Sequence, residues 1–151
     1  MIKANVISGY SNWKKIIKKP NDYLEKRLKI LSKKPLFLKK NHEFSILLTN
    51  EKKMKYLNHK FRKKNKTTDV LSFPIKIKEK KKLYVGDIAI SYEIIKDRSK
   101  KTNFFLEFDK IILSIFLSNN IVSATATAKK VLPVPAGPAE IIMSDSLKAL
   151  T

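Results

Sequence analysis

Residues 57–74 read LNHKFRKKNKTTDVLSFP, and the fold of the chain is predicted outward from the helix, loop and strand that this stretch indicates. A helix is predicted to enter the stretch, because apolar side chains recur at steps of three and four, namely at Met54, Leu57 and Phe61. Asn50 suits the N-cap of this helix, which should run to about Arg62. The polar residues 63–68 then predict a loop, which leads into a strand over residues 69–73 closed by the final proline.

The elements predicted on either side mix strands with helices. Upstream, the pattern predicts a strand at Ile2 to Ser8, one helix or two from Trp13 to Leu31, and a strand at Glu43 to Thr49. Pro20 suits the first turn of a helix that is capped near Lys19. Downstream, it predicts a lysine-rich turn at Lys78 to Lys82, a second hairpin strand at Leu83 to Ser91, a short helix or turn at Tyr92 to Lys101, and a buried helix at Phe104 to Leu117. Because no strict strand-helix-strand repeat runs through the chain, the predicted fold class is α+β, a single domain with a small mixed β-sheet flanked by helices.

Length and composition narrow the class of protein. The 151 residues suit one domain, and the absence of cysteine excludes disulfides, thiolate zinc sites and cysteine nucleophiles. No apolar run approaches the roughly 18 to 20 residues that cross a bilayer. The first residues lack the features of a secretory signal, so a soluble, cytoplasmic protein is expected.

Charge is the strongest compositional signal. The chain carries 33 basic and 13 acidic residues, enough to neutralise several phosphates of a nucleic acid. Thirty of the basic residues are lysines, however, and such an excess beside many asparagines and isoleucines is also what an AT-rich coding sequence produces. Charge alone therefore leaves nucleic-acid binding and compositional drift as equal alternatives.

The composition changes sharply near the end of the chain. Residues 1–122 contain two alanines, whereas the last 29 residues contain six. Residues 1–110 carry 30 basic and 11 acidic side chains, a net charge of +19, and residues 111–151 carry three and two, a net charge of +1. The predicted organisation is therefore one domain over residues 1–118 and an atypical, disordered tail over residues 119–151.

The helix end and loop of the quoted stretch have the chemistry of a phosphate-binding site. An arginine at the end of a basic helix offers a forked donor, and the loop after it adds charged and amide groups. The residues that offer these groups to a phosphate backbone are Arg62, Lys63, Lys64, Asn65 and Lys66. A solvated helix end with ordinary turn chemistry is the alternative on the residues alone.

Two motifs resemble those of the YbeY family of bacterial metal-dependent endoribonucleases. The quoted stretch fits the family pattern LN-x-x-[FY]-R-x-x-[ND]-K-x-T-[DN]-VLSFP, and residues 86–91 read GDIAIS where the family has G-D-I-x-I-S. The resemblance covers roughly residues 40–118. It implies a single-strand-specific endoribonuclease that acts in small-subunit rRNA maturation and ribosome quality control, with rRNA and the small ribosomal subunit as partners and neither membrane nor DNA. It also implies a catalytic role for Arg62 beside the active site. The residues that it implies for RNA binding are Arg62, Lys63, Lys64, Asn65 and Lys66.

The family's third motif, H-G-x-L-H-L-x-G-x-D-H, is not matched. It supplies three imidazoles for a zinc ion, and the aligned positions here are Ser114, Ser118 and Ala124, with Ile115 in place of the glycine. No metal ligand is therefore assigned, and this chain is expected to bind no zinc and to be inactive as written. A frameshift or degraded copy near codon 110 would explain both this loss and the change in composition.

Two other functions are also compatible with the sequence. The first is a non-catalytic, basic RNA- or ribosome-binding protein that keeps Arg62, and the second is a basic ribosomal or structural protein whose motif match is accidental. The chain's two histidines, His42 and His59, are expected to be surface or satisfied core residues. Asp69 and Ser72 are expected to fix the strand and its turn, and Asp87 is expected to be structural, with the orientation of a neighbouring residue as the alternative. Whether the chain is an enzyme is left undecided by the sequence.

Overall fold

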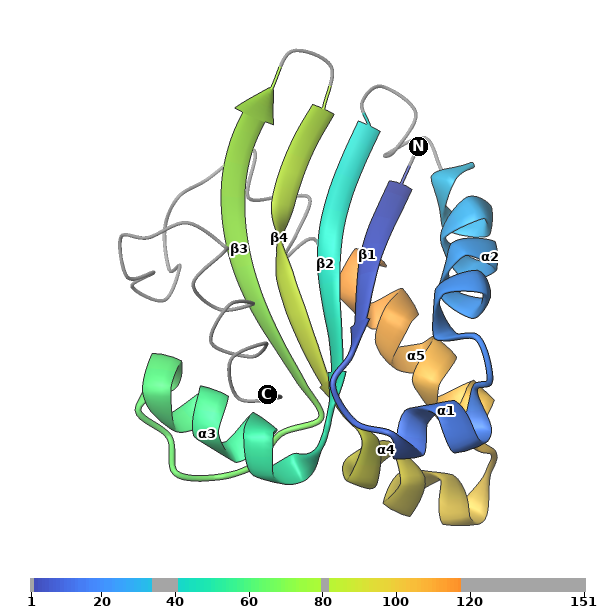
Figure 1. Ribbon diagram of the computed structural model, residues 1–151, viewed down its shortest axis with the longest axis vertical. Helices are drawn as coiled ribbons and strands as arrows, with labels where there is room; N and C mark the ends of the chain where they lie inside the picture. The colour runs from blue at the N-terminus through green and yellow to red at the C-terminus, as the bar shows by residue number, and fades with distance from the viewer. Residues whose placement is uncertain (1, 34–40, 80–81, 118–151) are drawn as a thin grey trace.

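The computed structural model describes residues 2–33, 41–79 and 82–117 (Figure 1). The elements in chain order are β1 (Ile2–Ser8), α1 (Asn12–Ile16), α2 (Pro20–Ser32), β2 (Asn41–Thr49), α3 (Glu51–Arg62), β3 (Val70–Glu79), β4 (Lys82–Ser91), α4 (Tyr92–Arg98), a short 3-10 helix (Ser99–Lys101) and α5 (Phe104–Leu117). The predicted tail over residues 119–151 lies outside the described residues.

The four strands form one mixed sheet in the order β1-β2-β4-β3. β1 and β2 are parallel, as are β2 and β4, and β3 runs antiparallel to β4. A parallel pair needs a crossover connection, and α1 and α2 supply it between β1 and β2. The predicted α+β class with a small mixed sheet is confirmed.

The hairpin of β3 and β4 corrects the sequence-based prediction in two places. The predicted strand end at Pro74 is wrong, because β3 continues through that residue to Glu79. Proline lacks a backbone N–H, but β3 is an edge strand and the pairing register shifts between Pro74 and Ile77, so the ladder accommodates it. The predicted turn at 78–82 is also shorter, since Glu79 pairs with Lys82 and only residues 80–81 lie between the strands.

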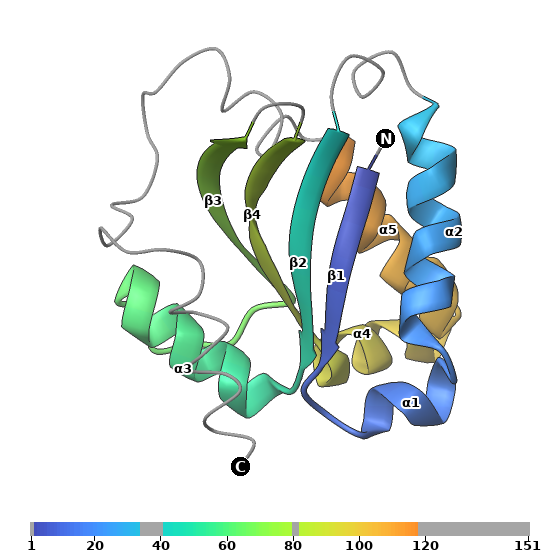
Figure 2. The ribbon, with the colours of Figure 1, turned by 45° about the horizontal axis from the view of Figure 1, so that its top comes forward.

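Apolar side chains fill both faces of the sheet. The larger core joins α1, α2, α4 and α5 to one face, where Trp13, Leu24, Phe44 and Phe108 are buried. The smaller core lies on the other face under α3 and consists of Leu47, Met54, Leu57, Leu71, Phe73 and Ala89. Figures 1 and 2 show α2 and α5 on one side of the sheet and α3 on the other, near one end of the strands. That end carries the residues of the candidate site.

The predicted helices are confirmed with one correction. α2 begins at Pro20 after an N-cap at Lys19, and α3 begins after Asn50, as expected. α5 was predicted to be buried, but only one side of it is, because Leu106 and Leu113 are 48% and 42% exposed. A helix that packs on one face of a sheet leaves its outer side in solvent. Within the described ranges, no helix has the length and apolar character needed to span a membrane.

Candidate nucleic-acid interface

The site begins with α3, whose two ends are both fixed by hydrogen bonds. At its start, the Asn50 side chain accepts a hydrogen bond from the Lys53 backbone N–H at 2.8 Å, which is the predicted N-cap. At its end, Lys63 adopts a left-handed conformation with φ of 57°, and its N–H donates to the His59 carbonyl at 3.0 Å. A left-handed residue that is not glycine costs roughly 1–2 kcal/mol, so the surrounding contacts must stabilise this turn.

A buried asparagine holds the loop that follows α3. The Asn58 side chain is 2% exposed, and its Nδ2 donates to the Lys66 carbonyl at 2.7 Å. The Asn58 carbonyl also accepts from the Lys64 N–H at 3.3 Å. One side of the loop is therefore tied to the last turns of α3, which fixes the backbone on which the loop lysines are carried.

Asp69 fixes the far end of the same loop. Its Oδ1 accepts from the Val70 N–H at 2.9 Å, and its Oδ2 is 2.5 Å from Nη1 of Arg98 on α4. Its carbonyl accepts from the Ser91 N–H at 2.9 Å, which ties it to the end of β4. The expectation that Asp69 has a structural role is confirmed by these contacts.

Arg62 lies between the two anchored ends. Its Nε is buried and has no hydrogen-bond partner among the described residues, and the same is true of Asn58 Oδ1 and Thr67 Oγ1. Six side-chain atoms of the described chain are in this state, and three of them belong to this one helix and loop. Because buried polar atoms are normally paired, these three atoms leave hydrogen bonds at this helix and loop for water or a polar ligand to complete.

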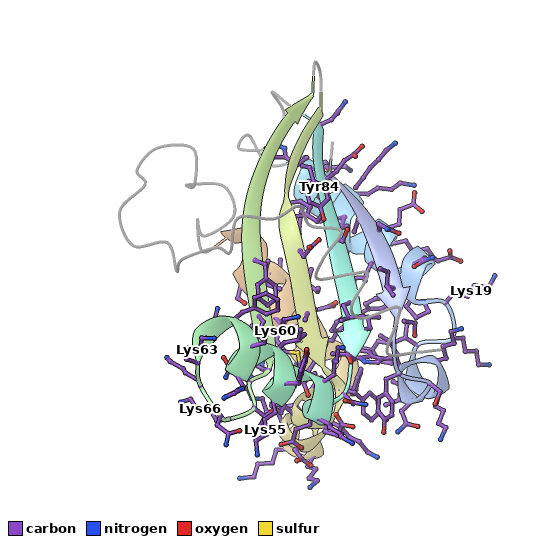
Figure 3. All side chains as sticks on the ribbon, turned by 60° about the vertical axis from the view of Figure 1, so that its left-hand side comes forward. Lys19, Lys55, Lys60, Lys63, Lys66 and Tyr84 are labelled. Atoms are coloured by element: carbon purple, nitrogen blue, oxygen red, sulfur yellow. The ribbon has the colours of Figure 1, made fainter. Side chains whose placement is uncertain are left out.

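The other predicted RNA-binding residues follow Arg62 directly and are all exposed: Lys63, Lys64, Asn65 and Lys66. Figure 3 shows Lys63 and Lys66 on the turn at the end of α3, with Lys55 and Lys60 on the helix itself and Lys19 on the far side of the molecule. The fold therefore brings the predicted residues together on one loop. Their role in RNA binding stays a prediction.

The described residues do not fit a zinc site of three imidazoles. Among them, no group of three or more histidine, cysteine, aspartate or glutamate side chains could hold a metal ion. His42 is buried on β2 and His59 is exposed on α3. The Ser114 hydroxyl donates to the Ile111 carbonyl within α5 at 2.8 Å, and Ser118 and Ala124 lie outside the described residues.

A second polar group lies on the sheet, toward the opposite end from the α3 loop, where Figure 3 labels Tyr84. The Tyr84 phenol donates to Asp87 Oδ1 and is 2.8 Å from Ser45 Oγ on the neighbouring strand. Asp87 is 2% exposed, and its Oδ2 has no partner among the described residues. Burial raises the pKa of the Asp87 carboxyl above its usual value, with hydrogen bonds from Tyr84 and Ser45 opposing that shift. Burial also raises the pKa of the Tyr84 phenol, which therefore stays a donor.

Asp87 should make the stability of the protein depend on pH. Its raised pKa means that the folded state holds the proton more tightly than the unfolded state, so this stabilisation is full at low pH and is lost as pH rises through the folded pKa. Asp87→Asn cannot ionise, and urea unfolding should show its stability relative to the parent increasing from pH 4 to pH 7. Asp87→Ala removes the hydrogen bond between the Tyr84 hydroxyl and Asp87, leaves Ser45 Oγ as the neighbour of that hydroxyl, and should cost about 0.5–1.5 kcal/mol. Asp97→Asn, at an exposed position, is the control, and an equal pH trend in it would remove the special role of Asp87.

The sequence did not identify Asn58 and Arg98 as parts of this site. Asn58 lies inside the quoted stretch, but its partner is a backbone carbonyl eight residues further on, so nothing in its spacing marks it. Arg98 is 29 residues from Asp69 and comes from a different helix. A pairing of this kind depends on where the fold places the end of α4 relative to the start of β3, which no local pattern contains.

The fold and the site together define a basic α+β domain with an arginine at the end of α3, and the comparisons give its family. A family model described as endoribonuclease YbeY matches residues 8–115. The endoribonuclease YbeY of Pelagibacter ubique is 44% identical over 119 residues, which are 78% of this chain and 76% of the relative. That of Ehrlichia canis is 36% identical over 114 residues, 71% of this chain and 68% of the relative. This chain belongs to the YbeY family.

The match also shows how far the likeness extends. It reaches further upstream than the predicted residues 40–118 and includes Arg62, the loop after it and the GDIAIS motif. It ends at residue 115, one position after Ser114. The positions aligned with the second and third histidines, Ser118 and Ala124, lie beyond the matched segment.

Proposed function

We propose that this chain is, by descent, a single-strand-specific endoribonuclease of small-subunit rRNA maturation and ribosome quality control, and that the sequence as given keeps RNA recognition but lacks hydrolysis. Its partners are rRNA and the small ribosomal subunit in the cytoplasm, and DNA is not a partner. The family membership supports the class of activity, since the matched relatives are named endoribonucleases. The observation that carries RNA recognition is the buried, unpartnered Nε of Arg62 beside an exposed basic loop.

The chemistry of a phosphodiester suits these residues. A guanidinium presents its donors in a planar fork, so Arg62 can give two parallel hydrogen bonds to one phosphate and neutralise its charge. The loop lysines are point charges on long stems, which suits them to neighbouring phosphates whose positions vary. The anchors at Asn58 and Asp69 hold the loop in place before the RNA arrives, which lowers the entropy lost on binding.

Hydrolysis requires more than this surface. In the family that the sequence resembles, three imidazoles bind a metal ion, whereas this sequence has two histidines at unrelated positions, His42 and His59. Serine hydroxyls are poor zinc ligands beside imidazole, and alanine has no donor. Arg62 can stabilise charge on a phosphate, but it cannot activate a water molecule, because a guanidinium donates hydrogen bonds and has no acceptor for the proton of water.

The salt dependence of RNA binding tests this proposal. A single-stranded RNA should bind the parent with a steep, linear loss of affinity as salt rises, because each neutralised phosphate contributes about −0.7 to the log-log slope. Lys63→Gln, Lys64→Gln and Lys66→Gln together should reduce the steepness by roughly 2 in that slope. The matched control is the triple replacement of the exposed lysines of α1 and its end, Lys14→Gln, Lys15→Gln and Lys18→Gln, which changes the net charge equally.

The affinities of the two triple variants decide whether the α3 loop binds RNA. The loop triple should lose far more affinity than the control triple, and a single-stranded DNA of the same sequence should bind more weakly than the RNA. A flat slope in the parent would show that the charge is compositional drift and would refute the proposal. An equal loss in both triples would mean that the α3 loop is not the binding site.

A further inference from the structure

Tyr56 is the exposed aromatic side chain of α3. It is 49% exposed, although the opposite side of the helix packs Met54 and Leu57 into the smaller core. The other large hydrophobic side chains that are exposed in the described ranges belong to α2 and α5, on the other face of the sheet: Ile30, Phe105, Leu106 and Leu113. Tyr56 therefore stands apart from them, on the helix that leads to the Arg62 loop.

Two lysine ammonium groups lie over this ring. Lys53 Nζ is 5.0 Å from the centroid of the Tyr56 ring, and Lys60 Nζ is 5.8 Å from it. Lys60 Nζ is also 5.4 Å from the ring of Phe61. These distances are within the range of cation–π attraction, which places a π face and positive charge at the same spot on the surface.

The geometry of α3 connects this ring to the loop. Lys63 follows Tyr56 by seven residues, nearly two helical turns, so the two positions share one side of the helix about 10 Å apart along its axis. Lys60 lies between them on the same side, and Figure 3 shows Lys60 and Lys63 toward the end of α3. The basic side of α3 therefore runs from the Tyr56 ring to the loop after Arg62.

We propose that Tyr56 is a stacking platform for one nucleobase of a single-stranded RNA whose phosphates lie on the lysines of α3 and its loop. The inference rests on the proposed function, because it names how that same surface holds its RNA. Aromatic rings stack with unpaired bases of any sequence, and lysines beside the ring suit the phosphates that flank the stacked base. A duplex keeps its bases paired and stacked inside the helix, so this arrangement selects a single strand.

Other occupants fit these observations less well. A membrane surface requires several apolar side chains on one side of a helix, whereas the outward side of α3 carries Tyr56 among lysines. An acidic protein would pair with the lysines but would leave the aromatic face unused. Lysines three and four residues from a tyrosine also stabilise a helix, and that role would change folding without changing the response to a nucleobase.

The test is an RNA-binding measurement on the full chain with two matched oligonucleotides. One is a short single-stranded RNA, and the other is the same backbone with abasic sites in place of all bases. Tyr56→Ala and Tyr56→Leu should each weaken binding of the normal RNA by about 5- to 150-fold, the range for loss of one stacked base. Tyr56→Phe keeps the ring and should stay within about twofold of the parent.

The abasic RNA separates stacking from charge. The parent should bind it more weakly than the normal RNA, and the two ring-removing variants should bind it as the parent does. Ile30→Ala, which removes an exposed apolar group from α2, should change neither affinity. If both ring-removing variants bind normal RNA like the parent, or lose affinity equally for both oligonucleotides, the stacking inference is wrong while RNA binding by the lysines stands. If the parent binds neither RNA, the proposed function itself fails.

Discussion

The protein with its sequence unaltered should purify without stoichiometric zinc and should cleave single-stranded RNA no faster than a sample without protein. Of the positions aligned with the three imidazoles, two carry serine and one alanine, so tight zinc binding is not expected. Without an ion, nothing lowers the pKa of an attacking water, and Arg62 can meet only the need for charge stabilisation. Elemental analysis and a labelled-RNA cleavage assay measure the two outcomes.

Restoring activity should need all three imidazoles at once. Ser114→His alone should do little, whereas Ser114→His, Ser118→His and Ala124→His together supply the ligand set. The family glycine is a separate problem, because Ile115 is 5% exposed in the larger core. Ile115→Gly removes a buried side chain and adds a glycine inside a helix, which together should cost about 3–6 kcal/mol.

The triple histidine variant should therefore be made first with Ile115 kept, and Ile115→Gly alone serves as the control for folding. Stoichiometric zinc in the unaltered protein, with cleavage abolished by a chelator, would contradict this prediction and point to ligands elsewhere in the chain. Zinc bound by the triple variant without cleavage would show that the ion alone does not rebuild the site.

The sequence predicted the fold well where a local pattern determines the structure. The apolar stripe of α3, the Asn50 cap and Pro20 at the start of α2 each depend on a few neighbouring residues, and each is confirmed. Pro74 shows the opposite case. Whether a proline ends a strand depends on whether that strand lies at the edge of the sheet, and strand order is a property of the whole chain.

The candidate site was also predicted only where a local pattern contains the information. The position of Arg62 at the end of a basic helix, with exposed lysines after it, was predicted from the motif. The contacts that hold the loop were not, because Asn58 and Arg98 act on partners that only the folded chain brings near. The unpartnered Nε of Arg62 is also invisible in a sequence, since it depends on burial by neighbouring elements.

Because this Nε has no partner, removal of the Arg62 guanidinium should affect RNA affinity and protein stability in opposite directions. Arg62→Met keeps most of the aliphatic stem and removes the guanidinium, and it should weaken binding of single-stranded RNA by about 1–3 kcal/mol if two hydrogen bonds to a phosphate are lost. The free energy of unfolding should not fall, and it should rise if anything, because the variant removes a buried donor that has no partner in the described residues. Arg62→Lys keeps the charge without the fork and should recover only part of the affinity.

Arg27→Met is the matched control, with the opposite expected result. Arg27 on α2 joins α5 through Asp109, with Nε and Nη2 at 3.1 and 2.8 Å from the carboxylate oxygens, and the guanidinium lies over the Tyr23 ring. Its loss should lower the free energy of unfolding and leave RNA affinity unchanged, because this contact belongs to the other face of the sheet. Urea unfolding and RNA titration of both variants give the full comparison. An Arg62→Met protein that binds RNA like its parent would mean that this guanidinium contacts no phosphate, and the loop lysines would then carry the binding alone.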